Sequence, residues 1–470
     1  MAASGEPGVN GPAFDLLVRG ATVVTNTGER AFDIGVLDGR IAALLEPGAA
    51  AAATKAYSAA GLHVLPGVID VHFHVRAPAH PERGTVESET RAAAAGGVTT
   101  LLEMPISKPC CATAEILRAR REHFASRAHV NFGFYGAPGL LNRQEVQGMA
   151  AEGAVAFKVF MTGAPKGRDD EFEGLCLTES AGLYQALELV AETGLVLSVH
   201  AEDESLIGHL TARLIAEGRN DPQAHFASRP PFVEAAAVAK LLAINRAVGA
   251  RVHVAHVSSR AALDVLRAFQ AMGEDVSGET CPPYLRFDQS ALERYGAYAK
   301  INPPLRTQDD ITALWEAVAD GTICCITTDH SPFTVAEKEL AKSDLWAAPP
   351  GAPGVEELVV STMDAVAAGR ITLVRAAQLL STDGAKRFGL YPRKGLVAVG
   401  SDADLTLVDL AGSTTIDRRQ LLSAARDTDL LHDGLTFRGR VAATILGGEV
   451  IFDGASVLNR PGDGSFVRPS

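Results

Sequence analysis

The chain has 470 residues, of which 47% are hydrophobic and 21% charged, and its formal net charge is -13 at pH 7. This length exceeds one ordinary hydrophobic core, so we expect a large barrel with an accessory domain, or two domains. The negative charge argues against non-specific nucleic-acid binding, and no apolar run is long enough to cross a membrane. The first residues lack the basic and apolar regions of a secretory signal, which favours a cytoplasmic protein.

The two ends of the chain share a sequence pattern typical of short β-strands. Residues 1–12 are rich in small residues, Gly and Pro, and we expect a flexible tail there. Residues 13–61 and 392–457 contain short apolar runs joined by Gly or Asp-Gly turns, such as DLLVRGATVVT and VAATILGGEVIFD. Neither flank alone makes a convincing core. We therefore predict one small β-sandwich built from both ends, followed by a C-terminal tail at 458–470.

Residues 62–391, between these flanks, alternate apolar runs with amphipathic stretches. Apolar strands that alternate with helices predict an α/β fold with a parallel sheet, and eight units predict closure into a (β/α)8 TIM barrel. Chemistry in such barrels lies at the C-terminal ends of the strands. The eight runs are HVLPGVIDVHFH, GVTTLLEMP, HVNFGFYG, AVAFKVFM, LVLSVHAE, RVHVAHVSS, DVSGET and TICCITTDHS.

Polar, metal-capable side chains stand at the ends of these runs. His72 and His74 close the first run, and their spacing of two puts both imidazoles on one face of a strand. His200, His256 and Asp329 end the fifth, sixth and eighth runs. An isolated histidine at such a place is more often structural, but the repetition on several strands predicts a metal centre.

Two further residues in these runs need separate treatment. Lys158 lies inside AVAFKVFM, where an unpaired ammonium is expensive to bury. Addition of carbon dioxide to its neutral amine would give a carbamate that can bridge two divalent cations. The alternative is that Lys158 reaches the rim or pairs with an acid such as Glu202. His253 precedes His256 by three residues, and we expect it to face outward.

These segments together resemble a known family. GVIDVHFH, AFKVFM, SVHAED, VAHVSS, ETCPPYL, INPPLR and TTDHSP are similar to motifs of the cyclic amidohydrolases, which include allantoinase, hydantoinase with dihydropyrimidinase, and dihydroorotase. The resemblance implies two divalent metal ions, with zinc as the first expectation and manganese, cobalt or iron as alternatives. It also assigns the ligands: carboxylated Lys158 bridges both ions, one of which is held by His72, His74 and Asp329, the other by His200 and His256.

The resemblance further implies a reaction. Water activated by the two metals attacks a carbonyl of a small cyclic amide, and Asp329 acts as general base and then as general acid toward the leaving ring nitrogen. The family is commonly tetrameric or dimeric, so a homotetramer or homodimer is expected.

The residues that distinguish subfamilies disagree. Arg76 completes an HxHxR pattern similar to that of dihydroorotases, in which the arginine binds a substrate carboxylate, and Asn302 matches their NPPLR. Ile106, however, stands where dihydroorotases have asparagine. Phe333 occupies an aromatic position of hydantoinases, but Gly163 stands where they have tyrosine. Arg76, Asn302 and Phe333 are therefore candidate substrate contacts.

Several alternatives stay open. Arg76 could instead form a salt bridge at the rim with Glu87 or Glu103. An allantoinase- or hydantoinase-type reaction on a ureide ring is our first prediction, and a dihydroorotase or another hydrolase of a carboxylate-bearing ring is the second. A non-catalytic, dihydropyrimidinase-like scaffold is the third, although such proteins typically lose metal ligands and this chain keeps all six.

Overall fold

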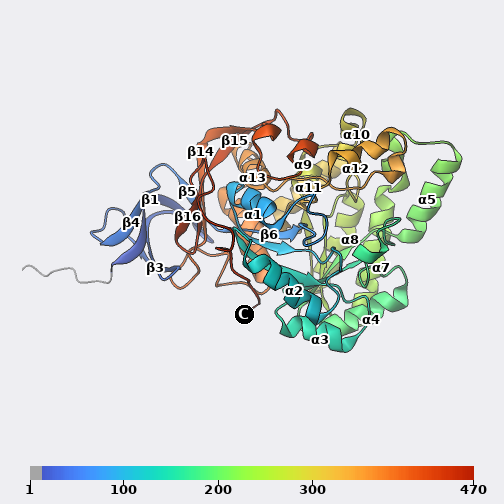
Figure 1. Cartoon of the computed structure of the whole chain (residues 1–470), viewed down its shortest axis with the longest axis horizontal. Helices are drawn as coiled ribbons and strands as arrows, with labels where there is room; N and C mark the ends of the chain where they lie inside the picture. Colours follow the sequence, from blue (N-terminus) through green and yellow to red (C-terminus); the bar gives the residue numbers. More distant parts are fainter. Residues whose placement is uncertain (1–12, 470) are drawn as a thin grey trace, which may run out of the picture.

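Eight parallel strands form a barrel in the central part of the chain. The structure is a computed structural model that describes residues 13–469 (Figure 1). Neighbouring strands follow sequence order, and Phe73 bridges His330 to close the ring. The predicted (β/α)8 barrel is confirmed. Its strands are β6 (Val68–Phe73), β7 (Val98–Glu103), β8 (Asn131–Gly136), β9 (Ala156–Phe160), β10 (Val196–His200), β11 (Arg251–Val254), β12 (Val276–Thr280) and β13 (Cys325–Ile326).

Helices surround this barrel, and polar caps define where several of them begin. The Thr85 and Thr307 side chains each accept a hydrogen bond from the third helical N–H, and the side chain of that third residue accepts one from the backbone N–H of the cap residue. The helices are α1 (Val86–Ala95), α2 (Ala114–Ala125), α3 (Arg143–Ala151), α4 (Ser180–Ala191), α5 (Glu204–Ala216), α6 (Pro222–Ser228), α7 (Pro231–Asn245), α8 (Arg260–Ala271), α9 (Pro282–Arg286), α10 (Ser290–Tyr295), α11 (Gln308–Asp320), α12 (Val335–Glu339), α13 (Leu358–Ala367), α14 (Leu373–Ala377) and α15 (Asp383–Arg387).

The two ends of the chain meet in a second sheet beside the barrel (Figure 1). Antiparallel pairing of β5 with β14 joins the N-terminal and C-terminal parts. The predicted accessory β domain made from both chain ends is thus confirmed. Its strands are β1 (Phe14–Thr25), β2 (Gly28–Leu37), β3 (Arg40–Leu45), β4 (Ala53–Ser58), β5 (His63–Pro66), β14 (Leu405–Thr415), β15 (Thr436–Leu446) and β16 (Glu449–Phe452).

Gly67 divides a segment that the sequence suggests is one strand. HVLPGVIDVHFH forms β5 of the accessory sheet and, after Gly67, β6 of the barrel. The Gly67 N–H donates to the Asp404 carbonyl at 2.8 Å, and a Cβ on Gly67 would lie only 2.8 Å from the Cβ of Asp404. Glycine therefore permits the close approach at which the chain passes from one sheet to the other.

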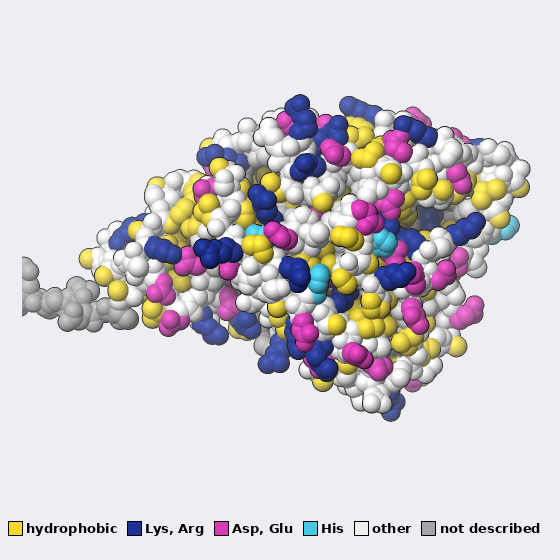
Figure 2. Space-filling view, in the orientation of Figure 1, with side chains coloured by type: hydrophobic (Ala, Val, Ile, Leu, Met, Phe, Trp, Pro, Cys, Tyr) yellow, Lys and Arg dark blue, Asp and Glu magenta, His cyan; other side chains and the backbone are white. Residues whose placement is uncertain are grey.

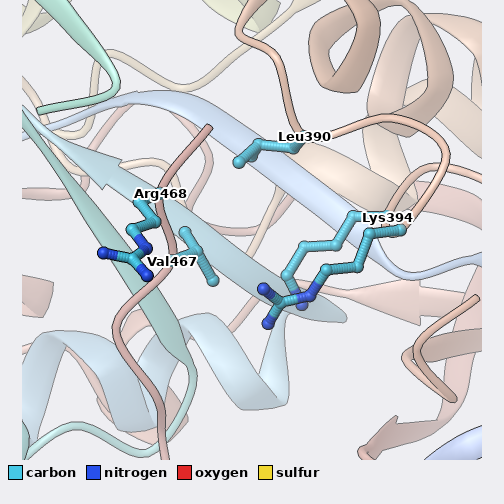
Figure 3. Close-up of a pocket in the computed structure, with 5 residues that line it drawn as sticks. Leu390, Lys394, Val467 and Arg468 are labelled. Carbon is cyan, nitrogen blue, oxygen red and sulfur yellow. The ribbon is translucent and has the colours of Figure 1, made fainter. Parts of the chain in front are cut away.

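The C-terminal segment packs against the end of the barrel opposite the predicted ligands. Val467 and Ser465 exchange backbone hydrogen bonds with Phe132 of β8. Figure 3 shows Val467 and Arg468 beside Leu390 and Lys394, with which they line a small pocket. None of the predicted ligands or substrate contacts lines this pocket, so it is separate from the candidate centre.

Figure 2 shows acidic and basic side chains interspersed over the visible face, so that neither sign dominates it. Within residues 13–469, no helix is both long and apolar enough to cross a membrane.

Candidate metal centre

Five of the six predicted ligands lie near, or shortly after, the C-terminal ends of barrel strands, and Lys158 lies in the middle of β9. Parallel strands bring their C-terminal ends to one face, which is why residues far apart in sequence converge there. Five of the six residues are buried, whereas 21% of the Asp329 side chain is exposed. The set consists of His72 in β6, His74 after it, Lys158 in β9, His200 at the end of β10, His256 after β11 and Asp329 after β13.

His72, His74 and Asp329 form the first half of the centre. Asp329 Oδ1 lies 3.2 Å from His72 Nε2 and 3.1 Å from His74 Nε2, and the three donor atoms lie within 4.8 Å of one another. Burial lowers the pKa of His74 well below its ordinary value. The neutral imidazole that results is the form that binds metal. These three side chains fit a single divalent cation.

His200, His256 and Lys158 form the second half. His200 Nδ1 faces His256 Nε2 at 3.0 Å, and the rings of His256 and His72 lie 5.3 Å apart, which joins the halves. Lys158 Nζ is fully buried and has no hydrogen-bond partner among the described residues. Burial lowers the pKa of Lys158 to about 8. A buried amine that is easily made neutral fits the carbamate expected from the family resemblance.

Glu202 does not pair with Lys158, contrary to the alternative considered from sequence. It accepts from His200 Nε2 at 2.9 Å and from Arg229 at 2.5 Å. Burial opposes ionisation of Glu202, but Arg229 and His200 prevail and lower its pKa to about 2. Glu202 therefore orients the imidazole of His200 from behind, as carboxylates commonly do for metal-binding histidines.

Glu279 in β12 supports the other half, and sequence reasoning missed it. One of its carboxylate oxygens contacts His72 Nδ1, and the other lies 3.0 Å from His253 Nε2. The prediction that His253 faces outward is wrong. Strand alternation turns Val252 and Val254 of β11 toward the helices, so His253 points into the barrel. Counting Glu279 and His253 along their strands would have placed both inside.

Three residues of the site have left-handed backbone conformations. The φ angles are 36° at His256, 49° at Asp329 and 60° at Arg76. Such conformations in residues other than glycine cost about 1 to 3 kcal/mol each and are retained where the surrounding structure imposes them. The surrounding structure thus fixes an unfavourable backbone conformation just after the strands that carry the predicted ligands.

Arg76 and Phe333 contact each other rather than an open cleft. The Arg76 guanidinium donates to the Pro332 carbonyl at 2.9 Å and to Ser331 Oγ at 2.6 Å, and it lies 4.5 Å above the Phe333 ring. The side chain of Arg76 forms no ion pair with Glu87 or Glu103; only its backbone N–H donates to Glu103. Phe333 is 1% exposed.

Loops from three strands meet around this stack. Arg83 follows β6 and pairs with Glu337, which belongs to the segment after β13. Arg168, after β9, pairs with Glu171 and lies 5.8 Å from the centre of the Phe333 ring. These contacts tie together the loops at the mouth of the barrel.

Asn302 lies in the connection between β12 and α11, which is on the same face of the barrel. Its Oδ1 is buried without a hydrogen-bond partner in the part of the chain described here. A buried oxygen without a partner can accept a hydrogen bond from an N–H group of a bound ligand.

Comparison of the sequence with known proteins identifies the family of this chain. The model of the amidohydrolase family matches residues 63–451. The chain belongs to the amidohydrolase family. An allantoinase of Rubrobacter xylanophilus is 37% identical over 463 residues, covering 97% of this chain and 98% of the relative. An L-hydantoinase of Paenarthrobacter aurescens is 34% identical over 456 residues, again with 97% and 98% covered.

Solved structures agree with these sequences. The L-hydantoinase (dihydropyrimidinase) from Arthrobacter aurescens superposes with a TM-score of 0.91 at 33% identity, covering 97% of this chain and all of that one. A D-hydantoinase gives a TM-score of 0.90 at 31% identity and similar coverage. The amidohydrolase predicted from sequence is confirmed, and its relatives are hydrolases of the hydantoinase and allantoinase type.

Proposed function

We propose that this protein opens a five-membered ureide or hydantoin-type ring by hydrolysing its cyclic amide bond, as the names of its relatives suggest. The observation that carries this proposal is the convergence of His72, His74 and Asp329 beside the amine of Lys158, which has no hydrogen-bond partner among the described residues. Two divalent cations would be held there, one by these three residues and one by His200 and His256, with carboxylated Lys158 between them. Zinc suits this ligand set, as do manganese, cobalt and iron.

When bound, such cations polarise a carbonyl and lower the pKa of an attacking water. The remaining proton transfers belong to Asp329. Burial raises its pKa, while the charges of His72 and Lys158 oppose this shift. Because Asp329 is also the most exposed of the six residues, its carboxylate can take a proton from water and return it to the departing ring nitrogen.

The test is ring opening by the purified protein with hydantoin, allantoin, dihydrouracil and dihydroorotate as substrates. We expect the highest kcat/KM for hydantoin or allantoin. Absence of turnover on all four, together with less than about one bound divalent ion per chain after reconstitution, would support a non-catalytic scaffold instead.

A second candidate is a ring that carries a carboxylate, such as dihydroorotate. The observation in its favour is that the Arg76 guanidinium is buried without a carboxylate partner among the described side chains, and that its Nε is unbonded. Under this alternative, dihydroorotate is the preferred substrate, and Arg76→Gln raises its KM while leaving that of hydantoin unchanged.

We further propose that the protein is a homotetramer or homodimer and that it is located in the cytoplasm.

A further inference from the structure

A second cluster of metal-capable side chains lies outside the centre described above. Glu357, Asp429 and His432 each bring a donor atom within 4.8 Å of the other two. All three are buried, with exposures of 1%, 1% and 2%. His432 Nδ1 lies 2.7 Å from Asp429 Oδ1, which fixes the ring beside the carboxylates.

The two carboxylates have oxygens without partners. Glu357 Oε1 and Asp429 Oδ2 are buried, and neither has a hydrogen-bond partner within residues 13–469. Buried carboxylate oxygens ordinarily accept several hydrogen bonds, because water is no longer present to solvate them. The two carboxylates can share a proton, since a side-chain hydrogen bond with Asp429 contributes to the raised pKa of Glu357, or they can bind a cation between them.

The surroundings are strongly acidic. No lysine or arginine of the described chain forms an ion pair with Glu356, Glu357 or Asp429. Burial, followed by the charges of Asp429 and Glu356, raises the pKa of Glu357 well above its ordinary value. Burial also raises the pKa of Glu356 to about 8. The fold therefore concentrates negative charge that only a proton or a cation can neutralise.

We propose that Glu357, Asp429 and His432 bind a structural divalent cation, separate from the catalytic centre. Two carboxylates and one imidazole suit a cation of the manganese-to-zinc series. A shared proton would neutralise one carboxylate, whereas a divalent cation neutralises both and also uses the imidazole that faces them.

The position of the cluster indicates what the cation would do. Glu357 directly precedes α13, whereas Asp429 and His432 belong to residues 416–435, which connect β14 to β15. Figure 1 shows α13 beside β15, and the two elements are in contact. The cation would join this connection of the accessory sheet to a helix of the barrel.

Neighbouring acids already hold the same connection. Glu356 accepts from the N–H groups of Leu422 and Ser423 at 2.8 and 3.1 Å. Glu89 accepts from Ser423 Oγ at 2.6 Å and from His330 Nε2 at 2.9 Å, and His330 follows Asp329 in the chain. The cation thus adds a third attachment to a segment that reaches the vicinity of the catalytic centre.

Metal analysis of the purified holoenzyme tests this site. We expect Glu357→Gln and Asp429→Asn each to hold about one divalent ion per chain fewer than wild type. Asp427→Asn is the matched control, because Asp427 lies in the same connection with its side chain 64% exposed. Equal metal content in wild type and all three variants would overturn the proposal and leave the shared proton as the explanation.

A measurement on wild type covers the case in which the variants do not fold. Crystals soaked in Mn²⁺ should give an anomalous difference peak bounded by Glu357, Asp429 and His432. A map with a peak at the catalytic centre and none at this cluster would overturn the structural site alone. A peak at this cluster and none at His72 and His74 would count against the proposed function instead.

Discussion

His72 Nδ1 is hydrogen-bonded to Glu279, whose second oxygen lies 3.0 Å from His253 Nε2. Although burial opposes it, these two histidines hold the pKa of Glu279 well below its usual range. The ionised carboxylate fixes the ring of His72 with Nε2 directed at Asp329, which lies 3.2 Å away. A carboxylate behind a metal-binding histidine orients the ring and raises its basicity.

Replacement of Glu279 should therefore weaken metal binding without removing a ligand. We expect Glu279→Gln to lower metal affinity about 10- to 100-fold, measured by competition with a chromophoric chelator. Ser277→Ala is the matched control, because it removes the 2.7 Å contact of His253 with Ser277 and leaves the bond between Glu279 and His72 intact. Unchanged metal affinity in Glu279→Gln would show that the ionised carboxylate of Glu279 does not contribute to metal binding by His72.

The two proposed roles of Asp329, metal ligand and proton carrier, should be separable by substitution. In Asp329→Asn the amide oxygen can still face His72 and His74, but it cannot take up a proton from water. We expect metal content to stay near that of wild type while kcat falls about 100- to 10,000-fold, the range typical of a lost general base. Metal analysis and steady-state kinetics on the same preparation check both parts, and a fully active variant would exclude this role.

Phe333 should contribute to stability through the cations around it. Besides Arg76, the Arg83 guanidinium and the Lys338 ammonium lie 5.0 and 5.3 Å from the centre of its ring. We expect Phe333→Leu to lower the free energy of unfolding by about 1 to 2 kcal/mol, through lost cation–π contacts and imperfect packing. Urea denaturation measures the change. The control Phe232→Leu, at a position 53% exposed, should be nearly neutral.

The barrel and the convergence of the candidate ligands were predictable because both follow from short-range patterns. Apolar runs of strand length predicted β6 to β13, and the C-terminal ends of parallel strands must share one face, so His72 and Asp329 could be brought together from sequence. The division at Gly67 was not predictable in this way. It depends on Asp404, more than three hundred residues away, which occupies the space that a side chain would need.

The supporting residues of the site were harder to identify than the ligands. Alternation along β12 would have turned Glu279 inward, but only its contacts with His72 and His253 reveal its role. The stack of Arg76 on Phe333 likewise depends on how the loops after β6 and β13 meet. Loop geometry of this kind is set by tertiary contacts that periodicity does not encode.

The pKa of Lys158 gives a prediction about activation of the metal-free protein. Burial lowers this pKa from 10.5 to about 8, so the neutral amine that reacts with carbon dioxide becomes more abundant as the pH rises toward and through 8. Below that value the neutral fraction falls about tenfold per pH unit. Between pH 8 and 10.5 the folded protein binds fewer protons at Lys158 than the unfolded chain, so this residue makes the metal-free protein more stable as the pH rises.

The experiment follows metal uptake and carbamate formation after chelation. With dissolved carbon dioxide held constant, metal uptake by the metal-free protein should be about tenfold slower at a pH one unit below the pKa of Lys158 than at a pH well above this pKa. The carbamate carbon can be followed by NMR with ¹³C-labelled bicarbonate. Lys158→Gln serves as the control, because it cannot form a carbamate and should show neither the signal nor this pH dependence. Uptake that is independent of pH in wild type would mean that Lys158 binds metal, if at all, without carboxylation.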